Sequence, residues 1–158
     1  MKNAIFILIL FVTGCSTNKN VPETKDRTED LVVIEVNIAE KENISFIITN
    51  TSNKLIYIYQ PHRLHIERFE NGTWENVRIL YCPCGAPCAK PPEKVDILVG
   101  GIHTWEWDKY ESWCGEKNEF GIPETIKKMA KNGKYRLRVL YSNSNNEQEV
   151  LYKKFELR

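Results

Sequence analysis

The stretch LVVIEVNIAEKENISFIITN, residues 31–50, decides the fold class of this protein. Apolar residues occupy every second position in both of its halves: Val32, Ile34, Val36 and Ile38, then Ile44, Phe46 and Ile48. Successive side chains of an extended chain point to opposite faces, so this spacing predicts two consecutive strands that each place one face in a hydrophobic core.

The chain beyond this stretch continues in short extended segments. Residues 55–59 (LIYIY) are β-branched or aromatic, and Asn71-Gly72 separates two alternating runs as the pair best suited to a tight hairpin. The other predicted strands lie near residues 64–66, 74–79, 95–99, 103–107, 135–141 and 150–157. Eight or nine strands with this regular spacing indicate an all-β sandwich.

Residues 123–131 carry the one helical pattern of the chain. Pro123 suits the first turn of a helix, and Asn132-Gly133 is typical of a C-terminal stop. The apolar residues between them fall on one helical stripe: Ile126, Met129 and Ala130. The sequence therefore predicts an all-β fold, an antiparallel β-sandwich over residues 31–158 with one short helix.

Length and charge exclude several classes of protein. The 158 residues are about one domain, which excludes a multidomain assembly. The 22 Lys and Arg residues are balanced by 21 Asp and Glu residues, so no basic excess is present to bind a phosphate backbone. Nucleic acid is therefore not an expected partner.

The N-terminal residues 1–14 have the organisation of a secretory signal peptide. Lys2 precedes an apolar run over residues 4–12, which is far shorter than the roughly 20 residues needed to span a bilayer. Residues 15–30 contain no aromatic residue and a mixture of both charges, so they cannot bury enough surface to fold. We expect an exported chain in which a flexible tether precedes the domain.

The end of the predicted signal peptide resembles a bacterial lipobox. Val12-Thr13-Gly14-Cys15 has the aliphatic residue, the two small residues and the cysteine of that motif. The resemblance implies lipidation of Cys15, cleavage before it, and attachment to a membrane of the bacterial cell envelope. Ser16 is not the Asp of the inner-membrane retention signal, so the outer membrane is favoured if two membranes are present.

A second resemblance concerns the folded domain. The segment NGKYRLRV, residues 132–139, resembles the start of strand F in immunoglobulin-like domains, where a tyrosine, here Tyr135, hydrogen-bonds back to the preceding loop. Together with residues 47–52 (IITNTS), Trp74 and Trp107-Asp108, it is similar to the BsuPI-type proteinase-inhibitor family. This resemblance implies an immunoglobulin-like sandwich that inhibits proteases. The namesake of that family is intracellular, whereas export is predicted here.

Four cysteines remain after Cys15: Cys82, Cys84, Cys88 and Cys114. An exported chain meets an oxidising environment, which favours two disulfides. A bond between Cys82 and Cys84 would close a strained ring, so these two residues are expected to pair with Cys88 and Cys114 in either order. Either pairing would staple the loop of residues 82–92 to a loop of residues 110–115.

A metal site is the alternative interpretation of the same cysteines. Cys84, Cys88 and Cys114, with His103 nearby, would be soft ligands for Cu(I) or Zn. The CPCGAPC spacing of residues 82–88 lacks the paired two-residue spacers of a zinc ribbon. Disulfides are therefore favoured, and no metal or cofactor is expected.

Four aromatic residues cluster near the last cysteine: Trp105, Trp107, Tyr110 and Trp113. Trp105 and Trp107 share one strand face, so at least one of them is expected in the core. Trp113 is expected on the surface of the stapled loops, where it would bind a protein or glycan partner with Tyr110 and Pro87.

Catalytic motifs are absent from the sequence. It contains neither Gly-x-Ser-x-Gly nor His-Glu-x-x-His. His62 and His65 have opposite strand parity, so they are not expected to converge on one metal. The sequence therefore predicts a lipid-anchored, non-catalytic binding module rather than an enzyme. Protease inhibition through the proline-rich loop of residues 82–92 is the alternative, and Cu or Zn binding is a lesser one.

Overall fold

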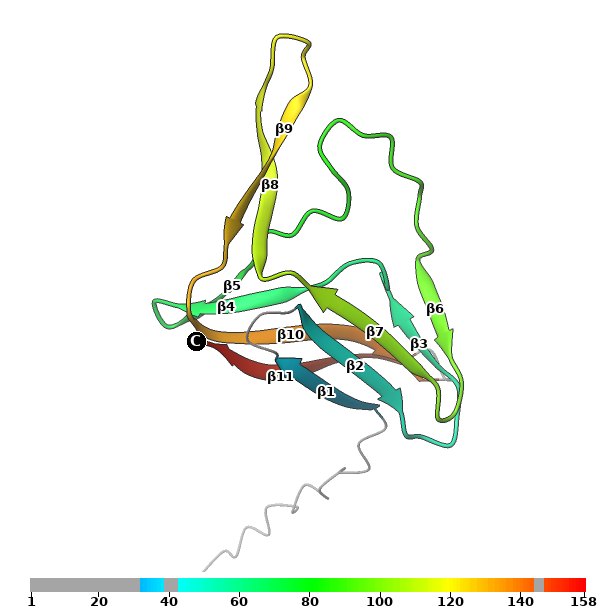
Figure 1. Cartoon of the computed structure of the whole chain (residues 1–158). Coiled ribbons are helices and arrows are strands. Elements are labelled where there is room, and N and C mark those ends of the chain that lie inside the picture. The colour runs from blue at the N-terminus through cyan, green and yellow to red at the C-terminus, as the bar shows by residue number, and fades with distance from the viewer. Residues whose placement is uncertain (1–31, 39–42, 144–146) are drawn as a thin grey trace, which may run out of the picture.

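The computed structural model describes residues 32–38, 43–143 and 147–158, and its regular structure there consists of strands (Figure 1). These strands are β1 (Val32–Ile38), β2 (Ile44–Asn50), β3 (Ile56–Tyr59), β4 (Ile66–Glu70), β5 (Thr73–Asn76), β6 (Lys94–Ile97), β7 (Ile102–Trp107), β8 (Tyr110–Lys117), β9 (Pro123–Met129), β10 (Gly133–Ser142) and β11 (Gln148–Leu157). The predicted signal peptide, the lipidation site Cys15 and the tether of residues 15–30 lie outside the described residues. Across the described ranges, no helix is long and apolar enough to cross a membrane.

Two antiparallel sheets form the body of the fold. The first has the order β1-β2-β7, and the second has the order β5-β4-β10-β3-β6, with β11 paired to β10. In Figure 1 the first sheet lies across the β10 and β11 strands of the second. This arrangement confirms the predicted β-sandwich.

The alternating pattern of residues 44–50 decides which side of the first sheet forms the core. Ile44, Phe46 and Ile48 are completely buried, and the residues between them are only partly so. The second sheet faces them with Ile56, Ile58, Ile66, Leu137 and Val139. Burial of each such side chain contributes about 1.5 to 3 kcal/mol, so these two faces supply most of the stabilisation.

An aromatic cluster joins the two sheets. Phe46 of β2 contacts Phe155 of β11 with ring centroids 5.3 Å apart, and Trp107 of β7 contacts Tyr135 of β10 at 5.6 Å. Trp107 is 1% exposed, which confirms that at least one of the two tryptophans on this strand belongs to the core. Each aromatic pair adds about 0.5 to 1.5 kcal/mol beyond its burial.

Two local predictions are confirmed by the backbone. Tyr135 donates its hydroxyl to the carbonyl oxygen of Lys131 over 2.5 Å, as expected for the tyrosine at the start of strand F. Asn71 and Gly72 join β4 to β5 with φ angles of 50° and 87°, as a tight hairpin requires.

The predicted helix over residues 123–131 is wrong, because this segment forms strand β9 and pairs with β8. The helical stripe that the sequence indicated is not formed, since Met129 is exposed and Ala130 lies beyond the strand in the core. Asn132-Gly133 ends no helix, and Gly133 instead begins β10. With the paired strands β8 and β9, the described residues contain eleven strands, against the expected eight or nine.

Candidate functional site

Strands β8 and β9 form a two-stranded ribbon that extends away from the sandwich (Figure 1). Tyr110 pairs with Met129 at its base, and Lys117 pairs with Pro123 near its end. The prediction that residues 110–115 form a loop is therefore wrong. Hairpin pairing with β9 gives this stretch a regular backbone that its sequence alone does not indicate.

Polar contacts fix the base of the ribbon to the sandwich. Ser112 is buried, its N–H donates to the carbonyl of Arg78 over 2.7 Å, and its hydroxyl accepts the N–H of Leu80 over 2.7 Å. Arg68 of β4 forms ion pairs with Glu70 and with Glu111 of β8. The ribbon therefore leaves the sandwich in a defined direction.

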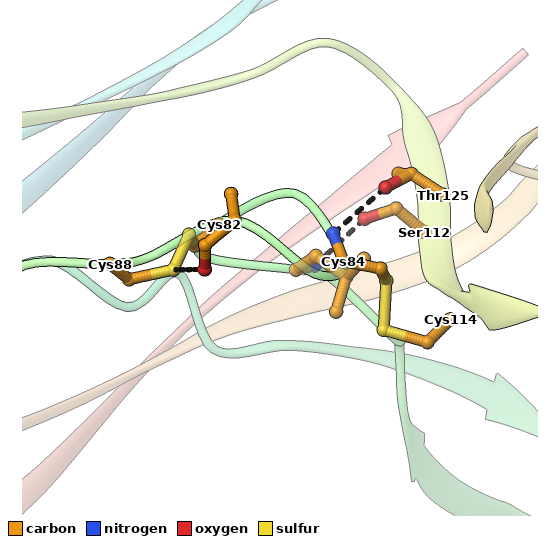
Figure 2. Close-up of a disulfide and its surroundings, with 8 residues drawn as sticks. Cys82, Cys84, Cys88, Ser112, Cys114 and Thr125 are labelled. Atoms are coloured by element: carbon orange, nitrogen blue, oxygen red, sulfur yellow. Dashed lines mark hydrogen bonds between the residues drawn. A yellow bond between two sulfur atoms is a disulfide. The ribbon is translucent and has the colours of Figure 1, made fainter. Parts of the chain in front are cut away.

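One disulfide connects the ribbon to the neighbouring loop, and a second lies within that loop (Figure 2). Cys84 bonds Cys114 of β8 with Cα atoms 5.6 Å apart, and Cys82 bonds Cys88 with Cα atoms 6.3 Å apart. The N–H of Cys84 also donates to the hydroxyl of Thr125 over 2.9 Å, so the loop contacts β9 as well. The two predicted disulfides are confirmed, and the order of pairing that the sequence left open is decided.

The same pairing is incompatible with the proposed cysteine metal site. Cys84, Cys88 and Cys114 are all in disulfides, and a disulfide sulfur is not the thiolate ligand that Cu(I) or Zn requires. His103 lies on β7, where its Nε2 is 3.3 Å from the carbonyl oxygen of Pro61. In the part of the chain that the structure describes, no three His, Cys, Asp or Glu side chains form a cluster that could hold a metal ion.

The three predicted binding residues do not form one aromatic platform. Trp113 is partly buried on β8, and the guanidinium carbon of Arg78 lies 4.0 Å from its ring centroid. Tyr110 is also on β8 but at opposite parity, so it faces the other side of the ribbon. Pro87 is exposed in the loop. Trp113 therefore lies on a strand and not in a loop, and its ring is partly covered.

Sequence reasoning missed the end of the ribbon, residues 118–122. The side-chain oxygen of Asn118 accepts the N–H groups of Phe120 and Ile122, each over 3.0 Å. The backbone N–H of Asn118 donates to the carbonyl of Ile122 over 2.9 Å. Phe120 is 78% exposed and Ile122 is 50% exposed, so this hydrogen-bonded turn displays two large apolar side chains. The available signal was an aromatic residue between the turn-forming residues Asn118 and Gly121.

The stapled loop lies directly against this turn. A Cβ atom on Gly85 would be 2.6 Å from Cγ2 of Ile122, and Gly85 has a φ of +74°, so both the contact and the backbone require glycine. Loop and ribbon therefore form one unit, which we call the stapled tip and define as residues 82–92 and 113–126. Its exposed charged residues at the end of the ribbon are Glu116, Lys117, Glu119 and Glu124, three acidic and one basic.

A concave region lies beside the sandwich, apart from the stapled tip. This hollow of about 810 Å³ is lined by His62 and His65 together with Tyr81, Trp105 and Arg138. Both histidines border this hollow, and His62 lies in a turn, where strand parity does not apply. Burial lowers the pKa of His65, and the nearby Arg138 lowers it further.

Comparison with known proteins gives no family assignment: no family model matches the chain, and no curated protein matches it.

Proposed function

We propose that this protein is a lipid-anchored, non-catalytic binding module of the bacterial cell envelope, and that it holds a protein partner through the stapled tip. The observation that carries the proposal is Phe120, which is 78% exposed on a turn held by four hydrogen bonds with Asn118. An exposed aromatic side chain on a rigid loop is a typical centre of a protein interface.

Rigidity makes this surface favourable for binding. The Cys84 to Cys114 disulfide and the Asn118 contacts restrain the stapled tip before any partner arrives. Association therefore loses little conformational entropy at this surface. Transfer of the Phe120 ring from water into an apolar pocket would contribute about 2 to 3 kcal/mol.

The charges of the stapled tip suggest the chemistry of the partner surface. Glu116, Glu119 and Glu124 are exposed on the ribbon beside the apolar turn, where Lys117 is the one basic residue, and the loop of the tip adds the exposed Lys90. Interfaces place an apolar centre inside a polar rim, and opposite charges across the rim direct the approach of the partner. We therefore expect the partner to offer an apolar pocket bordered by Lys or Arg.

Photo-crosslinking in intact cells tests the tip as the binding surface. A photoreactive amino acid in place of Phe120 should give a discrete protein adduct, because the partner would cover this residue. The matched control is the same replacement at Tyr152, an exposed aromatic on β11. Equal adducts at both positions, or none at Phe120, would refute the proposal.

A second experiment tests whether the Phe120 ring itself contributes to binding. Phe120→Ala should weaken binding of the partner identified by crosslinking at least tenfold. It should leave the thermal midpoint of the domain unchanged, since the ring is outside the core. A fall in the midpoint of the size seen for core aromatics would show a structural role instead.

Lipid anchoring rests on Val12-Thr13-Gly14-Cys15. The wild-type chain should incorporate a clickable palmitate analogue, and Cys15→Ser should abolish the label and accumulate uncleaved precursor. Unchanged labelling of that variant would refute the anchor without bearing on the stapled tip.

Protease inhibition is the second candidate. Residues 85–90 are six consecutive exposed positions in a loop that carries both disulfides, which is the form of a restrained inhibitory loop. Titration against trypsin-like and subtilisin-like proteases decides this alternative. Stoichiometric inhibition of the trypsin-like enzyme that Lys90→Ala abolishes would favour it, and absence of inhibition of both enzymes would exclude it for these two classes.

A further inference from the structure

The turn between β6 and β7 exposes three aliphatic side chains within five residues. Leu98 is 70% exposed, Val99 is 59% exposed and Ile102 is 63% exposed. Single exposed aliphatic residues are ordinary on protein surfaces, but a contiguous group of them marks a contact with another apolar phase or protein.

The turn that carries these residues has a defined backbone. The N–H of Gly101 donates to the carbonyl of Leu98 over 2.8 Å, and Gly100 has a φ of +71°. A positive φ at the third position is the signature of a type II turn, where glycine is preferred. Leu98 and Val99 are therefore held outward by the turn.

Asn50 places this turn at one particular end of the sandwich. Its carbonyl accepts the N–H of Gly100 over 2.9 Å, and its own N–H donates to the carbonyl of Gly101 over 3.0 Å. Asn50 is also the register partner of Val32, the first described residue of β1. The apolar turn therefore lies at the end of the sandwich where the chain from Cys15 enters the fold.

The stapled tip lies at the other end of the same strand. Strand β7 begins with Ile102 at the apolar turn and ends with Trp107, and β8 then starts the ribbon at Tyr110. Six residues of strand span roughly 20 Å, so the sandwich separates the two exposed apolar surfaces. Figure 1 shows the ribbon leaving the sandwich on the side away from the connection between β6 and β7.

We propose that residues 98–102 form a membrane-contact turn, whose aliphatic side chains enter the interfacial region of the bilayer that holds the lipid anchor. This proposal rests on the lipid anchoring of the proposed function. The domain would then stand on the membrane with its N-terminal end down and present the stapled tip away from the bilayer.

Because the tether is short, even a weak contact between the turn and the bilayer is enough to orient the domain. Sixteen residues lie between Cys15 and Val32, and a flexible chain of this length, as the sequence predicts here, has a root-mean-square span of about 20 to 25 Å. The tether therefore keeps the turn at a high effective concentration near the bilayer but does not orient the domain by itself. The apolar turn supplies the orientation. The same end carries the exposed cation Lys54, whose carbonyl accepts the side-chain N–H of Asn50.

Lipid photo-crosslinking of the full lipidated protein in its own cells tests the turn. Cells are fed a fatty acid that carries a diazirine and an alkyne, irradiated, and the protein is reduced and digested with trypsin. Lys19, Lys94, Lys109, Lys117 and Lys127 place the three regions of interest on separate peptides: residues 15–19, 95–109 and 118–127.

The expected result differs among the three peptides. Residues 15–19 should carry the attached lipid, residues 95–109 should carry photoadducts, and residues 118–127 should carry at least fivefold fewer. The combined variant Leu98→Ser, Val99→Ser and Ile102→Ser should lose the photoadducts and keep the lipid on residues 15–19. Phe120→Ser is the matched control, because it removes an equally exposed apolar residue at the other end and should change neither signal.

Other outcomes separate the turn from the anchor. Lipid on residues 15–19 without photoadducts on residues 95–109, or equal photoadducts on residues 118–127, would refute the membrane-contact turn alone. Photoadducts on residues 95–109 without lipid on residues 15–19 would refute the anchor and support the turn. If a photoreactive amino acid at Val99 gave protein adducts and no lipid adducts, the turn would be a protein interface and the proposal would be wrong.

Discussion

The side-chain nitrogen of Asn50 donates a hydrogen bond to the carbonyl oxygen of Ile97 over 2.9 Å, although 47 positions separate the two residues. The same nitrogen reaches the carbonyl of Leu98 at 3.1 Å, and the side-chain oxygen of Asn50 accepts from both the N–H and the hydroxyl of Ser52. Asn50 is completely buried, so these contacts replace all of its hydration. One side chain thereby joins the end of β2 to the end of β6 and positions the turn between β6 and β7.

Replacement of Asn50 by leucine should destabilise the domain by about 2 to 3 kcal/mol. The substitution keeps the approximate volume but leaves buried carbonyl oxygens without a donor, which carries the full desolvation cost of those groups. Urea unfolding measures the loss. Asn53→Ala, at an exposed position of the neighbouring turn, is the control and should change stability by less than about 0.5 kcal/mol.

Tyr135→Phe should cost about 0.5 to 1.5 kcal/mol, because it removes the hydrogen bond to Lys131 and keeps the ring in contact with Trp107 and Phe155. Tyr152→Phe removes a hydroxyl from an exposed ring and should be neutral. Chemical denaturation of the two variants gives the comparison. Equal changes in unfolding free energy for the two variants would show that the hydrogen bond from Tyr135 to Lys131 contributes nothing.

The two disulfides should contribute unequally to stability. Cys84 and Cys114 are 30 positions apart, whereas Cys82 and Cys88 are 6 apart. Loop-closure entropy then predicts a loss of about 3.5 kcal/mol when both Cys84 and Cys114 become alanine, against about 2 kcal/mol for the other pair. Urea unfolding of each double variant measures these losses. Mass spectrometry of the undigested, unreduced wild-type chain should give a mass lower by four hydrogens than that of its reduced form.

Trp113→Ala and Trp107→Ala should differ clearly in stability. Trp107 is buried in the aromatic cluster, so its loss should cost about 3 to 5 kcal/mol. Trp113 is partly buried and contacts Arg78 on the ribbon, so its loss should cost about 1 to 2 kcal/mol. Thermal unfolding separates the two. A Trp113 loss as large as that of Trp107 would mean that the ribbon belongs to the core.

The domain should lose stability as the pH falls below about 6.5, the usual pKa of histidine. Burial lowers the pKa of both His65 and His103 in the folded chain. Below pH 6.5 the unfolded chain binds protons that the folded chain does not, so this stability is present above pH 6.5 and is lost as the pH falls through the folded pKa values.

Urea unfolding at pH 7.5 and pH 5.5 measures this effect. A variant with both His65→Gln and His103→Gln should show a smaller difference between the two pH values than the wild type. An unchanged difference would assign the acid sensitivity to other groups.

Local chemistry made part of the fold predictable. The alternation of Ile44, Phe46 and Ile48 predicts a strand with one buried face because the period of two is a property of the extended backbone. The Asn71-Gly72 hairpin and the hydrogen bond from Tyr135 to Lys131 are also recognisable from sequence, since each depends on a few neighbouring residues. For the candidate site, two disulfides were predicted from four cysteines in a chain expected to be exported, but their pairing was not.

The sequence by itself determined that the chain forms strands with alternating buried faces and tight turns, because these features depend on residues close along the chain. Which strands pair was decided by the tertiary structure, since β2 pairs with β7 and β10 pairs with β4 across long separations in sequence. Only the tertiary structure decided that residues 123–129 form a strand, since the apolar spacing of Ile126 and Met129 fits a helix equally well locally. Ile126 pairs with Trp113 and Thr125 with Cys114 across the ribbon, and the Cys84 to Cys114 bond joins this hairpin to a loop 30 positions away. Such contacts outweigh helix propensities of a few tenths of a kcal/mol per residue, and they also bring the stapled loop against the ribbon and leave Phe120 exposed at its end.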